Sequence, residues 1–176
     1  MTDDDPDRRE LTVQIEAARQ AAVNAPDAES LHDLGRLLLE SYHRYGGTAL
    51  VAEALGILQQ AVEVSVADGT GWNGPRGALG AALATRYEIE GDPAMLDEAI
   101  DLLSAVVSQT PRDPVSGTDY RIGLGVALEA RVWVTGSQAD ADAAVALLHF
   151  DICHGISSLI RLIGCPSAIL VSVAVR

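Results

Sequence analysis

Apolar residues along most of this chain recur at steps of three and four, which is the spacing of one face of an α-helix. A first stripe consists of Leu31, Leu34, Leu38 and Tyr42, and after the glycine at position 46 a second stripe begins at Ala54. Two more pairs of stripes follow, each separated by a glycine, at Gly91 and at Gly136. The pattern predicts three successive units of helix, short loop and helix.

The three units repeat at a fixed distance. Leu-Gly pairs stand 45 residues apart at Leu34-Gly35, Leu79-Gly80 and Leu124-Gly125, and the second stripes carry Leu58, Leu103 and Leu148 in the same register. A fixed period of this size is typical of stacked supersecondary units, in which neighbours supply each other's core. Glycine inside a helix costs about 1 kcal/mol relative to alanine. Its repeated use at 35, 80 and 125 therefore predicts close helix approach.

Helix ends and linkers support the same division. Gly91-Asp92-Pro93 offers a C-terminal glycine, an N-cap acceptor and a first-turn proline, and Ser137 with Asp140 resembles a capping box. Glycine- and proline-rich loops are expected at 67–77 and 109–119. We expect an acidic N-terminus and capping helix over 1–27, repeat units over 28–72, 73–117 and 118–153, and an apolar tail over 154–176. The β-branched composition of 168–175 favours a strand.

The string L-x-x-L-G-x-x-L at 31–38, followed by Ala54-x-x-x-Leu58 and its copies, resembles the tetratricopeptide repeat (TPR) consensus. The resemblance covers residues 28 to about 150, and the period is longer than the usual 34 or so. Residues 79–113 resemble the long TPR-type repeats of actinobacterial proteins, which often precede CHAT-type caspase-like peptidase domains. The resemblance implies an all-α right-handed solenoid, with a concave face lined by the first helix of each pair.

The amino-acid composition excludes some classes of binding partner. The chain has 25 acidic and 12 basic residues and a formal charge of −13, so phosphate backbones and anionic membranes would repel it. No secretory signal is recognised, and the apolar stretch 156–175 contains Arg161 and the helix breaker Gly164-Cys165-Pro166. We expect a cytoplasmic protein with no membrane span, no nucleic-acid partner and no cofactor.

Residues 149–155 form the one cluster of catalytic residue types in the sequence. The segment resembles the stretch around the catalytic histidine of CHAT-type peptidases, with one residue too many. Cys153 and His154 are neighbours and would point about 100° apart on a helix, so they form no nucleophilic dyad, and the tail is too short for a peptidase sheet. A metal site would use His149, Asp151, Cys153 and His154, but zinc ligands usually converge from two segments. A frayed helix end explains the cluster more simply.

The function predicted from these features is a non-catalytic protein–protein interaction module that binds a peptide or helix on its concave face. The alternatives are a sensor arm of a truncated or diverged CHAT-type peptidase, and a structural oligomerisation module. The tail is expected to cap the last unit or to drive self-association. Trp72 and Trp133 are interpreted as loop and inter-helix packing, and Arg86 and Arg131 as solvated or salt-bridged. The binding candidates are His32, Arg36, Tyr42, Arg76, Tyr87, Arg121 and Glu129.

Overall fold

The computed structural model describes residues 5–109 and 116–147, and every regular element in those two ranges is an α-helix. The all-α prediction is therefore confirmed for this part of the chain. The tail from 154 onward, with the strand expected at 168–175, lies outside it. The helices are α1 (Pro6–Asn24), α2 (Ala28–Tyr45), α3 (Thr48–Ala67), α4 (Gly74–Glu90), α5 (Pro93–Gln109) and α6 (Ser116–Thr135), followed by a helical segment at 138–147.

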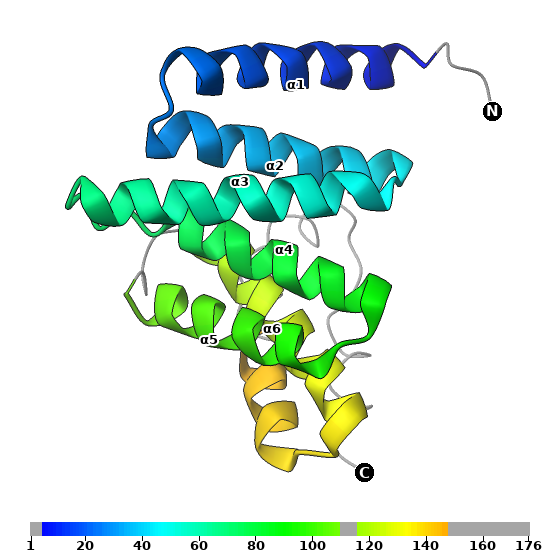
Figure 1. Ribbon diagram of the computed structural model, residues 1–176. Coiled ribbons are helices and arrows are strands. Elements are labelled where there is room, and N and C mark those ends of the chain that lie inside the picture. The colour runs from blue at the N-terminus through cyan, green and yellow to red at the C-terminus, as the bar shows by residue number, and fades with distance from the viewer. Residues whose placement is uncertain (1–4, 110–115, 148–176) are drawn as a thin grey trace, which may run out of the picture.

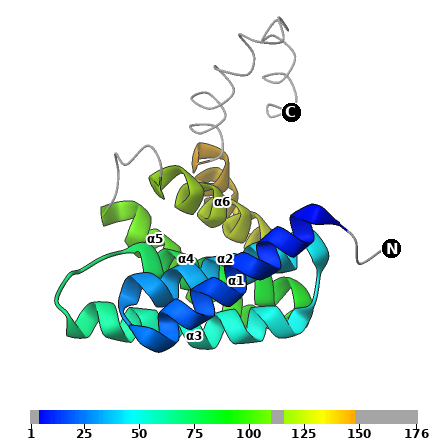
Figure 2. The same cartoon turned by 90° about the horizontal axis from the view of Figure 1, so that it is seen from above.

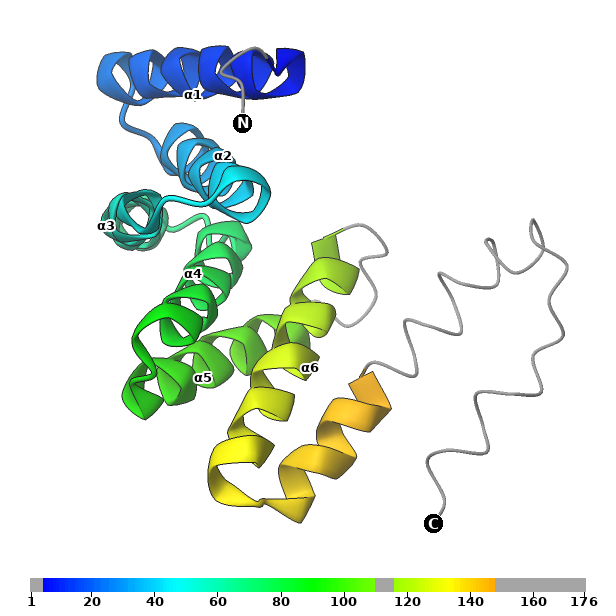
Figure 3. The same cartoon turned by 90° about the vertical axis from the view of Figure 1, so that its right-hand side faces the viewer.

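Consecutive helices follow one another through space from α1 at one end to residues 138–147 at the other (Figure 1, Figure 3). α2 packs with α3, α4 with α5, and each second helix packs with the first helix of the next pair. In the view from above, α1 lies across the helices beneath it (Figure 2). Among the labelled helices, Cα atoms within 8 Å of each other join only neighbours along the chain, α2 with α4, and α4 with α6.

The core consists of the predicted stripes. One cluster of buried residues runs from α1 to α4, reaches Ala99 of α5 and includes Leu38 and Leu58, both completely buried. A second cluster joins α5, α6 and the segment 138–147 around Leu96 and Leu103. The stripe of α1 packs into the first cluster through Leu11 and Ile15. The expected N-terminal helix is therefore present, and Arg19 on α1 also pairs with Glu53 on α3 at 2.7 Å.

The Leu-Gly glycines lie where two helices approach closely. A Cβ added to Gly35 would be 2.5 Å from Leu58 Cγ, and one added to Gly80 would be 2.8 Å from Leu103 Cγ. Carbon atoms in contact normally lie about 3.5–4.0 Å apart, so neither position has room for a methyl group without movement of the leucine. This is the close approach that the repeat register predicts. Gly125 is buried as well, and Leu148 lies outside the described residues.

The loops inside the pairs repeat with the same spacing. Gly46, Gly91 and Gly136 all adopt positive φ, which glycine tolerates without strain, and α3, α5 and the last segment begin at 48, 93 and 138. Asp92 accepts a hydrogen bond from the backbone N–H of Ala94 at 3.0 Å, as expected of an N-cap.

Three details of the helix ends differ from the prediction. The expected loop at 67–77 ends earlier, because Gly74–Gly77 already form the first turn of α4, where Pro75 needs no hydrogen-bond donor. The expected loop at 109–119 also ends earlier, because α6 begins at Ser116. The backbone N–H of Asp140 donates to Ser137 Oγ at 3.3 Å, but the N–H of Ser137 donates to Thr135 Oγ1. The reciprocal half of the capping box is thus absent, and the Asp140 carboxylate binds Arg131 instead.

Candidate interaction face

The first helices of the three helix pairs, α2, α4 and α6, form one continuous layer. Cα atoms of α2 come within 8 Å of α4, and those of α4 within 8 Å of α6, whereas α3 and α5 nowhere approach each other that closely. α3 and α5 therefore lie on the side of the molecule away from this layer. We call the exposed side of α2, α4 and α6 the inner face.

The inner face is built from positions that recur every 45 residues. Its character changes from charged on α2 to apolar on α6, and α4 between them contributes the small Ala81 and the acidic Glu88. The residues in register are Arg36, Ala81 and Val126, then Glu40, Thr85 and Ala130, then His43, Glu88 and Trp133, of which Thr85 is buried. Thr85 and His43 lie 3.5 Å apart between their Oγ1 and Nε2 atoms, which joins α2 and α4 across this surface.

The α6 end of the inner face exposes large apolar side chains. Ile122, Val126 and Trp133 are 42%, 43% and 84% exposed, and they lie on one stripe of the helix at steps of four and seven residues. Burying an aliphatic side chain of this size stabilises a complex by roughly 1.5–3 kcal/mol, and aromatic anchors dominate many interfaces. This stripe is the part of the inner face best suited to bind an apolar ligand surface.

The interpretation of Trp133 as inter-helix packing is wrong, because the indole points away from the helices that surround α6. The 45-residue register already indicated that position 133 is not a core position. The same position is His43 in the first unit and Glu88 in the second, both exposed, so a tryptophan there is out of keeping with a core role. Trp72, by contrast, lies in a loop as predicted, where it is 38% exposed and its ring contacts His32 of α2.

His32 is not available for binding. It is 8% exposed and lies under Trp72, with the two ring centroids 4.7 Å apart in an edge-to-face arrangement. Neither ring nitrogen has a hydrogen-bond partner, although Nδ1 lies 3.5 Å from the Asp33 carboxylate. Burial lowers the pKa of His32, so the neutral ring is favoured. The prediction placed this residue on the inner face because it could not foresee that the Trp72 loop covers it.

The other predicted binding residues differ in how far their side chains are exposed to solvent. Arg36 and Glu129 are exposed and remain accessible, whereas Arg76 and Arg121 are half-buried. Tyr42 and Tyr87 are also half-buried, and their rings pack against the two core clusters. Both tyrosines therefore serve the core at least as much as a surface, which fits their register with Val132.

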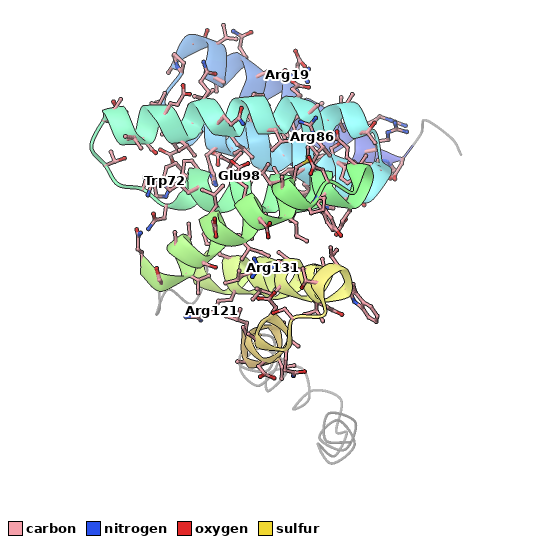
Figure 4. The ribbon with its side chains drawn as sticks, turned by 60° about the horizontal axis from the view of Figure 1, so that its bottom comes forward. Arg19, Trp72, Arg86, Glu98, Arg121 and Arg131 are labelled. Atoms are coloured by element: carbon pink, nitrogen blue, oxygen red, sulfur yellow. The ribbon has the colours of Figure 1, made fainter. Side chains whose placement is uncertain are left out.

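Arg131 pairs with two carboxylates from two different elements. It donates to Asp140 at 2.7 and 2.8 Å and to Asp97 at 3.2 Å, so one guanidinium joins α5, α6 and the last helical segment (Figure 4). These hydrogen bonds hold the pKa of the Asp140 carboxyl below its ordinary value and raise that of Arg131. Arg86, in the same register, pairs with Glu90 at 2.8 Å. The salt-bridged interpretation of both arginines is confirmed.

Within residues 5–109 and 116–147, no group of three or more His, Cys, Asp or Glu side chains is arranged to hold a metal ion. The cluster at 149–154 lies outside those ranges. Among the described helices, α3 is long and apolar enough to cross a membrane by length and composition alone, a test that the core helix of a soluble protein also passes. In the structure α3 is packed between α2 and α4.

Comparison of the chain with protein-family models, with curated protein sequences and with solved structures gave no match.

Proposed function

We propose that this chain is a TPR-like, right-handed solenoid of helix pairs that acts as a non-catalytic interaction module in the cytoplasm. Its ligand is an extended peptide or an amphipathic helix of another protein, bound along the inner face. The observation that carries the proposal is the exposed stripe of Ile122, Val126 and Trp133 on α6, at the end of a layer shared with α2 and α4.

The chemistry of the inner face restricts the ligand. Trp133 and Val126 on α6 offer an apolar anchor site, and Glu88 on α4 and Glu129 on α6 are exposed acidic groups. The chain as a whole carries a formal charge of −13. A ligand with two or three apolar side chains on one side and flanking Lys or Arg residues is therefore complementary, because opposite charges speed its approach and disfavour acidic competitors.

The proposal is tested by selecting ligands from a random 16-residue peptide library displayed on phage and measuring their affinity by fluorescence anisotropy. Trp133→Ala and Val126→Asp should each weaken the selected peptides by about tenfold or more, as expected for anchor positions. Val66→Asp is the matched control, because Val66 is exposed on α3, away from the inner face. Peptides that lose affinity equally with Val66→Asp, or not at all with Trp133→Ala, would overturn the proposal.

The same preparation tests the remaining alternatives. A peptidase would cleave members of a peptide panel, and Cys153→Ala would abolish the cleavage while the thermal melt stayed unchanged. We expect no cleavage. A purely structural module would assemble through the inner face, so light scattering would report an oligomer that Trp133→Ala dissociates.

A further inference from the structure

Arg86 and Arg131 occupy the same position in successive helix pairs, but they hold different numbers of carboxylates. Arg131 donates through Nε and Nη2 to Asp140 and through Nη1 to Asp97. Arg86 donates through Nε to Glu90 at 2.8 Å, and its Nη1 and Nη2 atoms have no hydrogen-bond partner in the described part of the chain. Arg131 therefore holds two carboxylates, and Arg86 holds one.

The 45-residue register shows where the second carboxylate of Arg86 is missing. Asp97 on α5 corresponds to Ala52 on α3, and Asp140 corresponds to Met95 on α5. Neither alanine nor methionine can form an ion pair with a guanidinium. Glu90, one turn after Arg86 on α4, compensates for one of the two losses. The position of Asp97 is left to the alanine.

A pocket of about 290 Å³ lies at this position, between the start of α3 and the end of α4, where Arg86 is found (Figure 4). Its lining includes Thr48, Ala49 and Ala52 of α3, and Arg86, Ile89 and Glu90 of α4. Pockets for drug-sized ligands measure roughly 300–1,000 Å³, so this one has room for a side chain or a group of similar size. Arg86 follows Ala81 of the inner face by five residues, about 140° around α4, so the pocket lies off that face.

The first turn of α3 adds hydrogen-bond donors to the pocket. α5 begins after Asp92, whose carboxylate accepts from the backbone N–H of Ala94 at 3.0 Å. Gly47 stands 45 residues before Asp92 and offers no side-chain acceptor, and Thr48 has the backbone N–H that Pro93 lacks. The N–H groups at the start of α3 are therefore without a capping carboxylate, at the helix end that favours an anion.

We propose that this pocket binds a carboxylate group of another molecule, supplied by an acidic side chain or by a polypeptide C-terminus, in the place that Asp97 takes beside Arg131. The Nη groups of Arg86 donate to it, with support from the first turn of α3. Glu90 remains on Nε, just as Asp140 remains on Nε of Arg131 while Asp97 binds Nη1. The site is separate from the inner face and does not depend on the function proposed above.

The test is an NMR titration of the isotope-labelled full chain with three short peptides at constant pH and ionic strength. Ac-Gly-Glu-Gly-NH2 carries a side-chain carboxylate, Ac-Gly-Gln-Gly-OH carries a terminal one, and Ac-Gly-Gln-Gly-NH2 carries none. We expect saturable shifts of the N–H signals of Thr48, Ala49 and Arg86 with at least one of the two acids and none with the neutral peptide. The acid that binds more tightly identifies the source of the carboxylate.

Two variants test the role of the arginine. Arg86→Gln should weaken the bound acid at least about tenfold, because the charge-assisted hydrogen bonds are lost. Ala52→Asp should weaken it as much, because the new carboxylate takes the place of Asp97 and occupies Arg86. Ala52 is exposed, so this variant keeps the test valid if Arg86→Gln unfolds. Arg44→Gln is the matched control and should keep the affinity within about twofold, because Arg44 pairs with Glu40 at 2.7 Å in an exposed i,i+4 pair outside the pocket lining.

Several results would overturn the proposal. No shift with either acid, equal shifts with all three peptides, or unchanged affinity in Arg86→Gln and Ala52→Asp would show that the pocket is not a carboxylate site. Tighter binding of inorganic phosphate than of either acid would assign the pocket to a different anion. An equal loss of affinity in Trp133→Ala would place the peptide on the inner face instead.

Discussion

Gly35→Ala adds a single methyl group at the closest approach of α2 and α3. The new Cβ would lie 2.5 Å from Leu58 Cγ and 2.6 Å from Leu58 Cδ2, about 1 Å inside normal carbon–carbon contact. Leu58 is completely buried, so it has no free space into which to rotate. Either the leucine leaves its preferred rotamer or the two helices separate.

The expected magnitude follows from two opposing effects. Overpacking of a well-filled core destabilises by about 1–3 kcal/mol, and replacing a helical glycine by alanine stabilises by about 0.5–1 kcal/mol. Because two atoms of one buried side chain are affected, we expect a net loss of about 2 kcal/mol. For a chain of this size that lowers the melting temperature by roughly 4–8 °C.

Gly56→Ala is the matched control, because Gly56 lies in α3 and a Cβ there would meet nothing within 4 Å. It should raise the melting temperature by roughly 1–4 °C. Both variants are measured by circular dichroism melts and by urea unfolding. A double-mutant cycle with Leu58→Ala should show that the leucine truncation costs less in the Gly35→Ala background. Equal stabilities of Gly35→Ala and Gly56→Ala would refute the close-approach argument.

Three further predictions concern other parts of the structure. Gly80→Leu should destabilise the chain by about 3 kcal/mol through collision with Leu103, and a thermal melt equal to the parent's would contradict this. Burial lowers the pKa of His32 in the folded state below its ordinary value of 6.5, so the unfolded chain binds the proton more readily. Stability should therefore be full above about pH 6.5 and fall at lower pH, and His32→Leu should reduce this dependence in urea titrations. Arg131→Gln should speed amide exchange in 138–147, because Asp97 and Asp140 lose their partner, whereas Arg86→Gln removes an exposed pair and should cost no more than about 0.5 kcal/mol.

The helices and their ends were predictable because they depend on local chemistry. A stripe such as Leu31, Leu34 and Leu38 has one stable helical arrangement, and Gly91, followed by Asp92 and Pro93, has the residues that favour the end of one helix and the start of the next. The start of α4 was missed because proline and glycine at 74–77 were taken as loop formers. Pro75 and Gly77 are accepted there since the first turn needs few backbone donors and Tyr120 fills the space beside Gly77.

The candidate site was less predictable. Arg36 and Glu129 are accessible as expected, but His32 is buried and the exposed apolar stripe of α6 was not proposed. The register shows which positions are equivalent, yet His32, Gly77 and Ile122 are equivalent and have three different environments. The environments of His32 and Gly77 depend on a residue about 40 positions further along the chain, Trp72 over His32 and Tyr120 beside Gly77.

The sequence by itself determined the helical class, the 45-residue spacing of the pairs and the glycines at which helices approach, because each of these follows from side-chain periodicity and backbone freedom. Only the tertiary structure decided that Arg131 joins three helices, that His32 is covered, and that Trp133 and Val145 are not. A helical stripe shows that a face is apolar but not which neighbour covers it. Which neighbour covers a face depends on the packing of residues that are distant in the sequence. In this protein that packing decides whether an apolar helix face becomes part of the core or remains an exposed surface that can bind a ligand.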